Sequence, residues 1–338
     1  MNAATHGRPV TLADIARAAG TSASTASRAL SGRGYVSAAA RKRLLAAADR
    51  LGYVADASAR TLKQRTSRVV GVVVSDLGNQ FYARLASGVE EELREADYQM
   101  FLLSDNSERA EELAGARAFA AMRAAGVIMA PVDYDAAPLL ARHGIPVVEV
   151  DRRLAKLPCD AVVVDNERGA RDATAHLIEL GHRRIGLLVA DTDWTTDAGR
   201  ARGYRAAHDE AGLTVDEQLV VPIGFHAADA DLLIDALLDA EPTAIFAANN
   251  LLAEQAWHVL RRHGLAIPED VSLVAFDDLA WMAMVEPGIT AVAQPIVEMG
   301  RHAARLLLRR LENPLADPEL VCLDPTLVVR GSSAPRNA

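Results

Sequence analysis

A run of small polar side chains with one arginine, residues 23–30, carries the clearest chemical signal in the first part of the chain. Drawn as a helix, the run places Ser24, Ser27 and Arg28 on one face. Ala26 and Leu30 point inward instead. Hydroxyl and guanidinium groups on a helix face can bond base edges in the DNA major groove, and small side chains let the backbone approach closely. The run is therefore a candidate DNA-reading surface.

Residue types that serve catalysis or metal binding occur singly. His143, His182 and His226 lie on separate segments, and no nucleophile elbow or phosphate loop accompanies them. Cys159 and Cys322 are far apart and have no partners at metal-ligand spacing, which excludes a zinc finger and a disulfide scaffold. An enzyme thus remains an alternative without a supporting motif. We expect no metal and no cofactor.

Three short helices are predicted to position the polar run. Thr11 is the N-cap of the first helix, which ends at Gly20. The second covers residues 23–30 and the third runs over about 37–51. Two short helices joined by a tight glycine-containing turn indicate a helix-turn-helix, although alanine-rich helix pairs also occur in other bundles. Apolar side chains expected to face inward are Ile15, Ala16, Ala19, Leu44, Leu45 and Ala48.

Charge is distributed very unevenly along the chain. Residues 1–65 contain eleven Lys and Arg against three Asp, a net charge of +8. Because the whole chain carries −9, the remaining residues carry −17. A basic head on an acidic body suits binding to a polyanion through one end, and a solvated basic surface is the alternative.

Length and composition limit the class of protein. A chain of 338 residues, half of them hydrophobic, is long enough for two or three folded domains. Residues 1–20 contain no apolar core of a signal peptide, and no run of about 20 apolar residues occurs. We therefore expect a cytoplasmic protein without a membrane span. The same absence of a signal argues against a periplasmic binding protein.

From residue 68 onward, short apolar runs alternate with longer helical stretches. The predicted strands cover 69–75, 99–104, 126–129, 147–150, 161–164, 185–189, 219–222, 244–247 and 271–276, with a last strand near 327–330. The predicted helices include 81–96, 108–125, 168–180, 198–211, 227–238 and 251–263. This alternation favours parallel sheets covered on both faces, here as two α/β lobes in tandem. Ligands bind such folds at the carboxyl ends of the strands, in the cleft between lobes.

The first part of the chain resembles the headpiece of the LacI/GalR family of bacterial regulators. The resemblance is carried by residues 10–16, 24–30, 36–37 and 51–54, and it continues into a hinge helix at 59–63. It implies that Leu62 wedges into the minor groove at the centre of an operator, where an apolar wedge bends DNA. An ordinary buried helix residue is the alternative for Leu62.

The resemblance also implies which residues contact DNA. The expected set is Thr11, Ser22, Ala23, Ser24, Thr25, Ser27, Arg28, Ala59, Leu62 and Lys63. Ala23 and Ser24 stand at the base-reading positions and are small, so Arg28 is the stronger candidate for a bidentate guanine contact. Thr25 and Ser27 are expected to bond phosphates.

The remainder of the chain is similar to the periplasmic-binding-protein-like effector domain of the same family. Matching segments are 71–76, 79–82, 148–152, 163–166, 180–186, 198–204, 248–250, 267–278 and 290–295. The effector-binding residues implied by these motifs are Phe81, Arg152, Asp165, Arg200, Phe225, Asn249 and Asp277, with Trp281 as a further candidate. Structural alternatives are a cross-lobe ion pair between Arg152 and Asp277, core packing of Phe225 and Trp281, and helix capping by Asp165. Two residues depart from the family pattern: Asn250 replaces an aspartate and Gln80 replaces a proline.

Together these patterns predict an all-α helix-turn-helix headpiece followed by an α/β two-lobed periplasmic-binding-protein-like effector domain. The expected boundaries are 1–57 for the headpiece, 58–67 for the hinge and 68–338 for the effector domain. Lobe 1 should cover about 68–164 and 293–322, and lobe 2 about 165–292 and 323–331. The resemblance implies a homodimeric repressor of carbohydrate use that binds a pseudo-palindromic operator and responds to a sugar or sugar derivative.

Overall fold

The chain divides into two units, Met1–Arg65 and Thr66–Ala338. The computed structural model describes residues 10–31, 34–53, 67–154, 158–192, 194–224 and 229–336. Each unit has hydrophobic clusters of its own, and each is described by itself below.

The N-terminal unit is a three-helix domain made of α1 (Leu12–Ala18), α2 (Ala23–Ser31) and α3 (Ala38–Leu51). At the start of α1, the Asp14 carboxylate accepts the backbone N–H of Thr11 at 3.0 Å and its hydroxyl at 2.7 Å. Gly20 follows α1 with φ +65°, the left-handed conformation predicted for the end of that helix. Its core consists of small and branched apolar side chains: Ile15, Ala16, Ala19, Ala26, Ala29, Leu44, Ala47 and Ala48.

One residue that was predicted to lie in the core of this unit, Leu45, does not lie there. Leu45 is 50% exposed, whereas Leu44 is fully buried. Neighbouring residues of a helix are rotated by about 100°, so the face that contains Leu44 continues at Ala47 and Ala48. Leu45 consequently faces away from the three-helix core.

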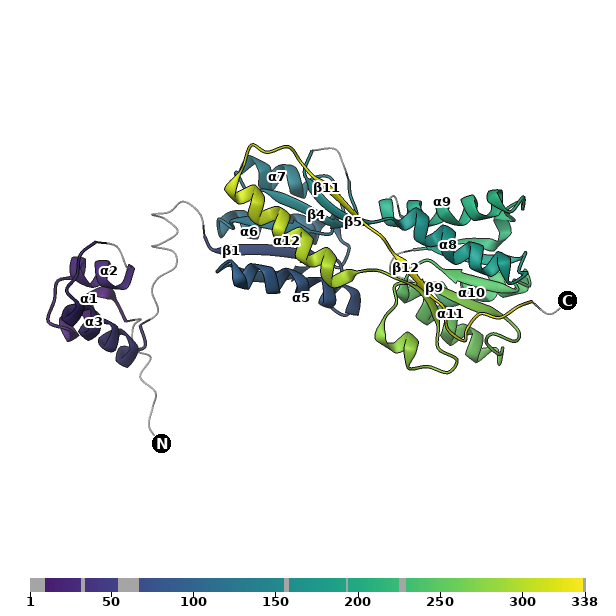
Figure 1. The fold of residues 1–338 in the computed structure, drawn as a ribbon, viewed down its shortest axis with the longest axis horizontal. Coiled ribbons are helices and arrows are strands. Elements are labelled where there is room, and N and C mark those ends of the chain that lie inside the picture. The colour runs from purple at the N-terminus through teal and green to yellow at the C-terminus, as the bar shows by residue number, and fades with distance from the viewer. Residues whose placement is uncertain are drawn as a thin grey trace, which may run out of the picture. The chain divides into compact units, whose positions relative to one another are not determined.

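Lobe 1 of the larger unit contains a six-stranded sheet in the order β11-β5-β4-β3-β1-β2, with all neighbours parallel. The strands are β1 (Val69–Val74), β2 (Gln99–Ser104), β3 (Gly126–Met129), β4 (Val147–Asp151), β5 (Asp160–Val164) and β11 (Leu320–Leu323). Helices α5 (Gln80–Glu95) and α12 (Ile296–Glu312) cover one face, and α6 (Arg109–Ala121) and α7 (Ala136–Arg142) the other (Figure 1). Alternating strand residues join two separate clusters: Val72 packs with α5 and α12, and Val73 with α6.

Lobe 2 repeats this plan with a second six-stranded sheet, ordered β12-β10-β9-β8-β6-β7. Its strands are β6 (Ile185–Ala190), β7 (Val220–Ile223), β8 (Ala244–Ala247), β9 (Ser272–Phe276), β10 (Thr290–Ala293) and β12 (Thr326–Val328), of which β10 and β12 are antiparallel. Its helices are α8 (Asn166–Glu179), α9 (Thr195–Glu210), α10 (Ala230–Asp239) and α11 (Asn250–Arg262), with short 3₁₀ turns η1 (Glu217–Leu219) and η2 (Ala280–Ala283). Helices α8 and α9 pack together, as do α10 and α11.

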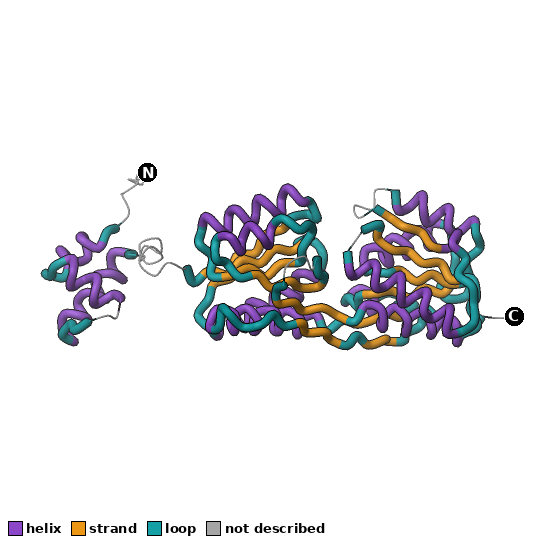
Figure 2. The backbone as a smooth tube through the Cα atoms, turned by 90° about the horizontal axis from the view of Figure 1, so that it is seen from above, coloured by secondary structure: helices purple, strands orange, loops and turns teal. Residues whose placement is uncertain are grey.

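The chain passes between the two sheets three times, after β5, after β10 and after β11. Strand β11 lies beside β5, and β12 lies beside β10. At the first passage the backbone N–H of Asp165 donates to the carbonyl of Leu323 at 3.0 Å. The three passages therefore run side by side and form the hinge between the lobes (Figure 2).

Glycines allow two helix pairs to approach closely. A Cβ on Gly300 of α12 would lie 2.1 Å from the carbonyl oxygen of Leu85 in α5, and one on Gly88 would lie 2.1 Å from that of Val297. Across α8 and α9, a Cβ on Gly203 would lie 2.1 Å from the carbonyl oxygen of Glu167. Only a residue without a side chain fits at these crossings.

The predicted strands agree with the observed ones to within a residue or two at each end, and the predicted helix starts are less accurate. The helices predicted to begin at 81, 168 and 251 begin at 80, 166 and 250. Their caps are the polar side chains of Asn79, Asp165 and Asn249, each of which accepts a backbone N–H of the first turn. The errors are larger for two other helices: the one predicted to begin at 198 begins at 195, and the one predicted to begin at 227 begins at 230. The predicted elements do not include β10, β11, α7 or α12.

Candidate ligand site and nucleic-acid interface

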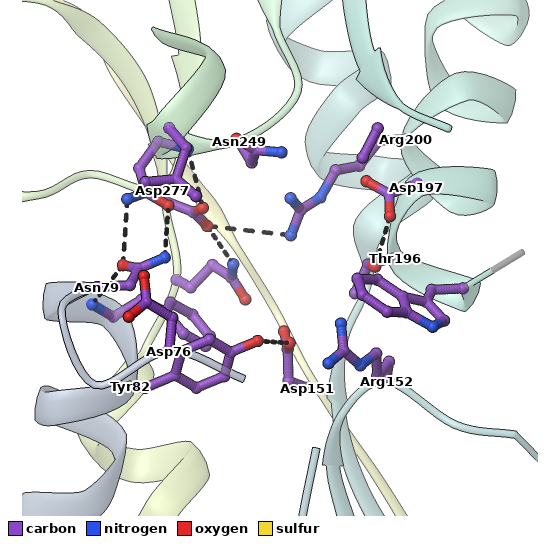
Figure 3. A pocket seen from close by; sticks show the side chains of 16 residues that line it. Asp76, Asn79, Tyr82, Asp151, Arg152, Thr196, Asp197, Arg200, Asn249 and Asp277 are labelled. Carbon is purple, nitrogen blue, oxygen red and sulfur yellow. Dashed lines mark hydrogen bonds and ion pairs between the residues drawn. The ribbon is translucent and has the colours of Figure 1, made fainter. Parts of the chain in front are cut away.

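A pocket of about 60 Å³ lies between the two lobes, where the strands of both sheets end (Figure 3). Asp76 follows β1, Asp151 ends β4 and Asp277 follows β9. Carboxylate, amide, guanidinium and aromatic side chains line the pocket: Asp76, Asn79, Phe81, Tyr82, Asp151 and Arg152 from lobe 1, Trp194, Thr196, Asp197, Arg200, Asn249, Asn250, Leu251 and Asp277 from lobe 2, with Ala190 and Gln294.

Arg200 and Asp277 form the charged wall of lobe 2. The Arg200 guanidinium donates to Asn166 Oδ1 at 2.8 Å and to the Ala248 carbonyl at 2.6 Å, and lies 3.9 Å from Asp277 Oδ1. Asp277 also accepts the backbone N–H of Asn250 at 3.2 Å and the Gln294 side-chain amide. Both residues are almost fully buried. Fixed partners hold the two charges at the pocket, ready to bond a polar ligand.

Asp151 and Arg152 form the corresponding wall of lobe 1. The Asp151 carboxylate accepts the Tyr82 hydroxyl at 3.2 Å, and burial raises the pKa of Asp151, with Arg152 opposing the shift. Burial likewise raises the pKa of Tyr82, which keeps its hydroxyl protonated as a donor. Asp151, the last residue of β4, and Asp277, the first residue after β9, both have φ +71°, so each lobe turns an aspartate into the pocket through a left-handed residue at the end of a strand.

The loop that follows β3 is held from two sides. The Glu112 carboxylate in α6 accepts the backbone N–H of Val132 at 2.7 Å and of Asp133 at 3.1 Å. Arg152 donates to the Pro131 carbonyl at 2.7 Å and to the Ala130 carbonyl at 3.4 Å. Glu112 is 1% exposed, and its burial raises its pKa to about 7, although the two N–H groups lower it.

Glu112→Gln is expected to flatten the pH dependence of stability. The folded-state pKa of about 7 lies above the ordinary 4.5, so stability from this group is full below pH 4.5 and is lost as pH rises through 7. The loss in the parent chain amounts to roughly 3 kcal/mol in the free energy of unfolding. Urea unfolding at pH 5 and pH 8 measures it, with Glu111→Gln, an exposed neighbour, as control. Parallel profiles for the parent and Glu112→Gln would contradict the assignment.

Five of the effector residues predicted from the sequence line the pocket: Phe81, Arg152, Arg200, Asn249 and Asp277. Two others do not. Asp165 caps α8 by accepting the backbone N–H of Arg168 at 3.0 Å, and half-buried Trp281 packs against two clusters of buried hydrophobic side chains. The structural alternative for Arg152 and Asp277, a cross-lobe ion pair, is not observed among the described residues, since Arg152 donates to carbonyls within lobe 1. Phe225 lies outside the described residues.

The sequence interpretation missed several lining residues, chiefly Asp151, Asp197, Trp194, Asn250 and Gln294. Each stands next to the end of a strand or the start of a helix, a positional signal that could have identified them. Gln80 and Asn250, the two departures from the family pattern, both make contacts between the lobes. Asn250 pairs with Asn79, and Gln80 Oε1 accepts the backbone N–H of Ala280 at 3.3 Å.

The side chains that line the pocket can form hydrogen bonds and apolar contacts with a polar ligand. Carboxylates accept and guanidinium or amide groups donate hydrogen bonds to hydroxyl groups, while Phe81 and Trp194 supply apolar faces. Neither a histidine nor a cysteine is among the described lining residues. No group of three potential metal-binding side chains occurs in the part of the chain that the structure describes. None of the helices among these described residues could cross a membrane.

The exposed face of α2 contains the residues predicted to contact DNA. Ser22, Ala23, Ser24, Ser27 and Arg28 are exposed, and Thr25 is half-buried. The Ser22 hydroxyl accepts the Thr25 backbone N–H at 3.2 Å and caps the helix. Arg28 Nε donates to the Ser24 carbonyl at 3.2 Å, along the outside of α2. Thr11 is also exposed, at the start of α1. The predicted hinge residues Ala59, Leu62 and Lys63 lie outside the described residues.

Comparisons with known proteins match both units. The family model described as "Bacterial regulatory proteins, lacI family" matches residues 11–56, and that described as "Periplasmic binding protein-like domain" matches residues 174–333. The HTH-type transcriptional regulator DegA of Bacillus subtilis (strain 168) is 32% identical over 333 residues, which cover 97% of this chain and 99% of that protein.

Two similar solved structures contain sugars. The complex of the transcriptional regulator CelR with cellobiose has a TM-score of 0.73 at 34% identity, covering 96% of this chain and 100% of that one. A LacI family transcriptional regulator from Enterococcus faecium with bound ribose has a TM-score of 0.72 at 30% identity, covering 80% of this chain and 100% of that one.

Proposed function

This chain belongs to the LacI family of bacterial transcriptional regulators, and from that premise we propose that it is a sugar-responsive repressor acting as a homodimer on a pseudo-palindromic operator. The cleft carries the sensing part of the proposal. Buried Asp151 and Asp277 offer acceptors from opposite lobes, Arg200 offers donors, and aromatic rings cover apolar faces. This combination suits a small polyhydroxylated molecule, and two structural relatives hold cellobiose and ribose.

The effector-binding residues that we propose are Phe81, Arg152, Arg200, Asn249 and Asp277, with Asp151, Asp197 and Trp194 added from the geometry. The proposed DNA-contacting set is unchanged from the sequence, with α2 in the major groove and Leu62 at the centre of the operator. The proposed dimer is supported by β2, the edge strand of the lobe 1 sheet, where the apolar side chains of Phe101 and Leu103 are 48% and 36% exposed. An edge strand with exposed apolar side chains is suited to contact with a second copy of the chain.

The proposed function is tested with the full chain and DNA duplexes that it selects from a random library. Affinity for a selected duplex should fall steeply with salt, and addition of ribose, cellobiose or another sugar should change it. Fluorescence anisotropy measures both effects, and sedimentation of the complex gives its stoichiometry. A chain that selects no sequence would overturn the regulator assignment. Selection without any sugar response would overturn the effector class alone.

Arg28→Ala is expected to weaken binding to the selected duplex about 10- to 100-fold and to relax preference at one base position. The exposed guanidinium on α2 is the strongest bidentate donor for a guanine among the residues proposed to read bases. Competition between selected and scrambled duplexes measures the loss. Arg50→Ala, an exposed arginine at the end of α3, is the control and should weaken both duplexes alike or leave both unchanged. Equal losses for Arg28→Ala on both duplexes would mean that it contacts only phosphate.

A further inference from the structure

Side chains of the two lobes contact each other directly on both sides of the pocket. On one side, lobe 1 residues Asn79 and Gln80 meet Asn250 and Ala280 of lobe 2, and the Asn79 and Asn250 amides exchange hydrogen bonds of 3.1 and 3.4 Å. On the other side, Trp194 of lobe 2 reaches across to lobe 1. This second contact involves a buried charge.

Trp194 makes two different contacts with lobe 1. Its ring lies over the Arg152 guanidinium, with the Arg152 Cζ 3.5 Å from the ring centroid. Its indole Nε1–H donates to the Val132 carbonyl at 3.3 Å, in the loop that Glu112 and Arg152 hold. The next residue adds a third contact, because the backbone N–H of Arg153 donates to Thr195 Oγ1 at 3.0 Å. Although it lies at the start of α9 beside the pocket, Trp194 is only 9% exposed.

The Trp194 ring stabilises the buried charge of Arg152. Arg152 is 2% exposed, and no ion pair among the described residues includes it. Its guanidinium donates to the carbonyls of Ala130 and Pro131 and to the Ser75 hydroxyl, all in lobe 1. Burying a cation is costly: the charge of the nearby Asp151 carboxylate offsets part of this cost, and the aromatic face of Trp194 offsets a further part. Separation of the lobes would take Trp194 away and leave the guanidinium beside the open cleft.

We propose that Trp194 is the positioning residue for closure of the effector cleft: lobe 2 closes by seating the indole on Arg152, which lobe 1 holds rigidly. Arg152 then acts as a docking platform for the other lobe as well as a wall of the pocket. Closure of the cleft and coverage of the Arg152 charge become a single event, so effector affinity depends on this contact between the lobes in addition to the contacts that the effector itself makes. The dependence of effector affinity rests on the proposed function, whereas the seating itself does not.

The seating is tested without any effector, by acrylamide quenching of Trp194 fluorescence in the full chain. Trp257→Phe and Trp281→Phe together leave Trp194 as the single tryptophan of the chain. In this background we expect weak quenching and a several-fold rise on Arg152→Ala. Arg305→Ala, which removes a lobe 1 arginine paired with Glu92 on the α12 surface, is the control and should leave quenching unchanged. Quenching of Trp194 as strong as that of free indole would overturn the proposal.

A second variant distinguishes loss of the contact between the lobes from a structural change inside lobe 1 caused by Arg152→Ala. Thr195→Val removes the hydroxyl acceptor of the Arg153 N–H and touches neither the indole nor the interior of lobe 1. It should raise quenching by less than Arg152→Ala does. If Arg152→Ala raises quenching and Thr195→Val does not, Trp194 responds to local change in lobe 1, and the proposal of a seating between lobes fails.

The effect on binding is tested with D-ribose as the probe. Trp194→Ala should weaken ribose binding about 10-fold, and Trp194→Phe should weaken it less because the ring still covers Arg152. Trp257→Phe, which also removes an indole of lobe 2, is the matched control and should bind ribose as the parent does. Equal affinities of parent and Trp194→Ala would overturn the role in closure. If the parent itself does not bind ribose, the proposed effector class fails, and the quenching experiment decides the seating independently.

Discussion

Asp277→Asn is expected to weaken effector binding roughly 100-fold. The carboxylate accepts the Asn250 N–H and the Gln294 amide and faces Arg200 at 3.9 Å. An asparagine keeps the shape and tolerates φ +71°, but it lacks the charge and directs an NH₂ group toward donors. Buried Arg200 would then lose its nearby anion, and a ligand hydroxyl would lose its acceptor. Isothermal titration with the sugar that most raises the melting temperature measures the loss.

The neighbouring residue provides a matched control for this prediction. Asp278 pairs with Arg330 at 2.7 and 2.9 Å and does not line the pocket. Asp278→Asn makes the same chemical change one residue along the chain, so it should lower stability slightly and leave effector affinity unchanged. Similar affinities for Asp277→Asn and Asp278→Asn would remove Asp277 from the binding site.

Gly300→Ala is expected to destabilise lobe 1 by about 3 kcal/mol or more. The added methyl carbon would lie 2.1 Å from the Leu85 carbonyl oxygen and 2.9 Å from the Val89 nitrogen, both in the backbone of α5. Backbone atoms cannot rotate away as the end of a side chain can, so α5 and α12 must separate. Gly88 of α5 lies at the same helix crossing, so close approach of the two helices depends on a glycine in each of them. Urea unfolding of the full chain measures the change.

Gly115→Ala serves as the control for the helix crossing. Gly115 lies inside α6 of the same lobe, and its added methyl would be 3.5 Å from a Leu103 methyl, an ordinary contact. Alanine is favoured over glycine within a helix by about 1 kcal/mol, so this variant should be as stable as the parent or more so. A Gly300→Ala variant as stable as Gly115→Ala would show that α5 and α12 can shift without cost.

Most of the fold follows from patterns that short segments carry by themselves. Strands such as 126–129 and 244–247 are short apolar runs bounded by helices, and their lengths alone identify them. The helix-turn-helix depends on local signals, a capping residue at Thr11 and a left-handed Gly20. Leu45 shows the limit of such signals, because it lies in a run of five adjacent apolar residues, 44–48, which leaves the direction of the helix face undecided.

The candidate site is less predictable because it is assembled from distant segments. Arg200 and Asp277 were identified through motifs, but the sequence does not indicate that a guanidinium in lobe 1 meets an indole in lobe 2. Asp165 illustrates the opposite error, since an aspartate between a strand and a helix can line a cleft or cap the helix, and here it caps. Such choices depend on side-chain directions that only the packed lobes determine.

The three passages between the lobes also restrict how the lobes can move. The three passages lie side by side and are linked by β-sheet pairing in both lobes, so we expect them to bend about one axis more easily than they twist. The relative motion of the lobes is thereby reduced to one principal degree of freedom. We therefore expect every effector, whatever its chemistry, to change the angle between the two lobes about the same axis. Effectors can then differ in how far they change this angle but not in the direction of the motion.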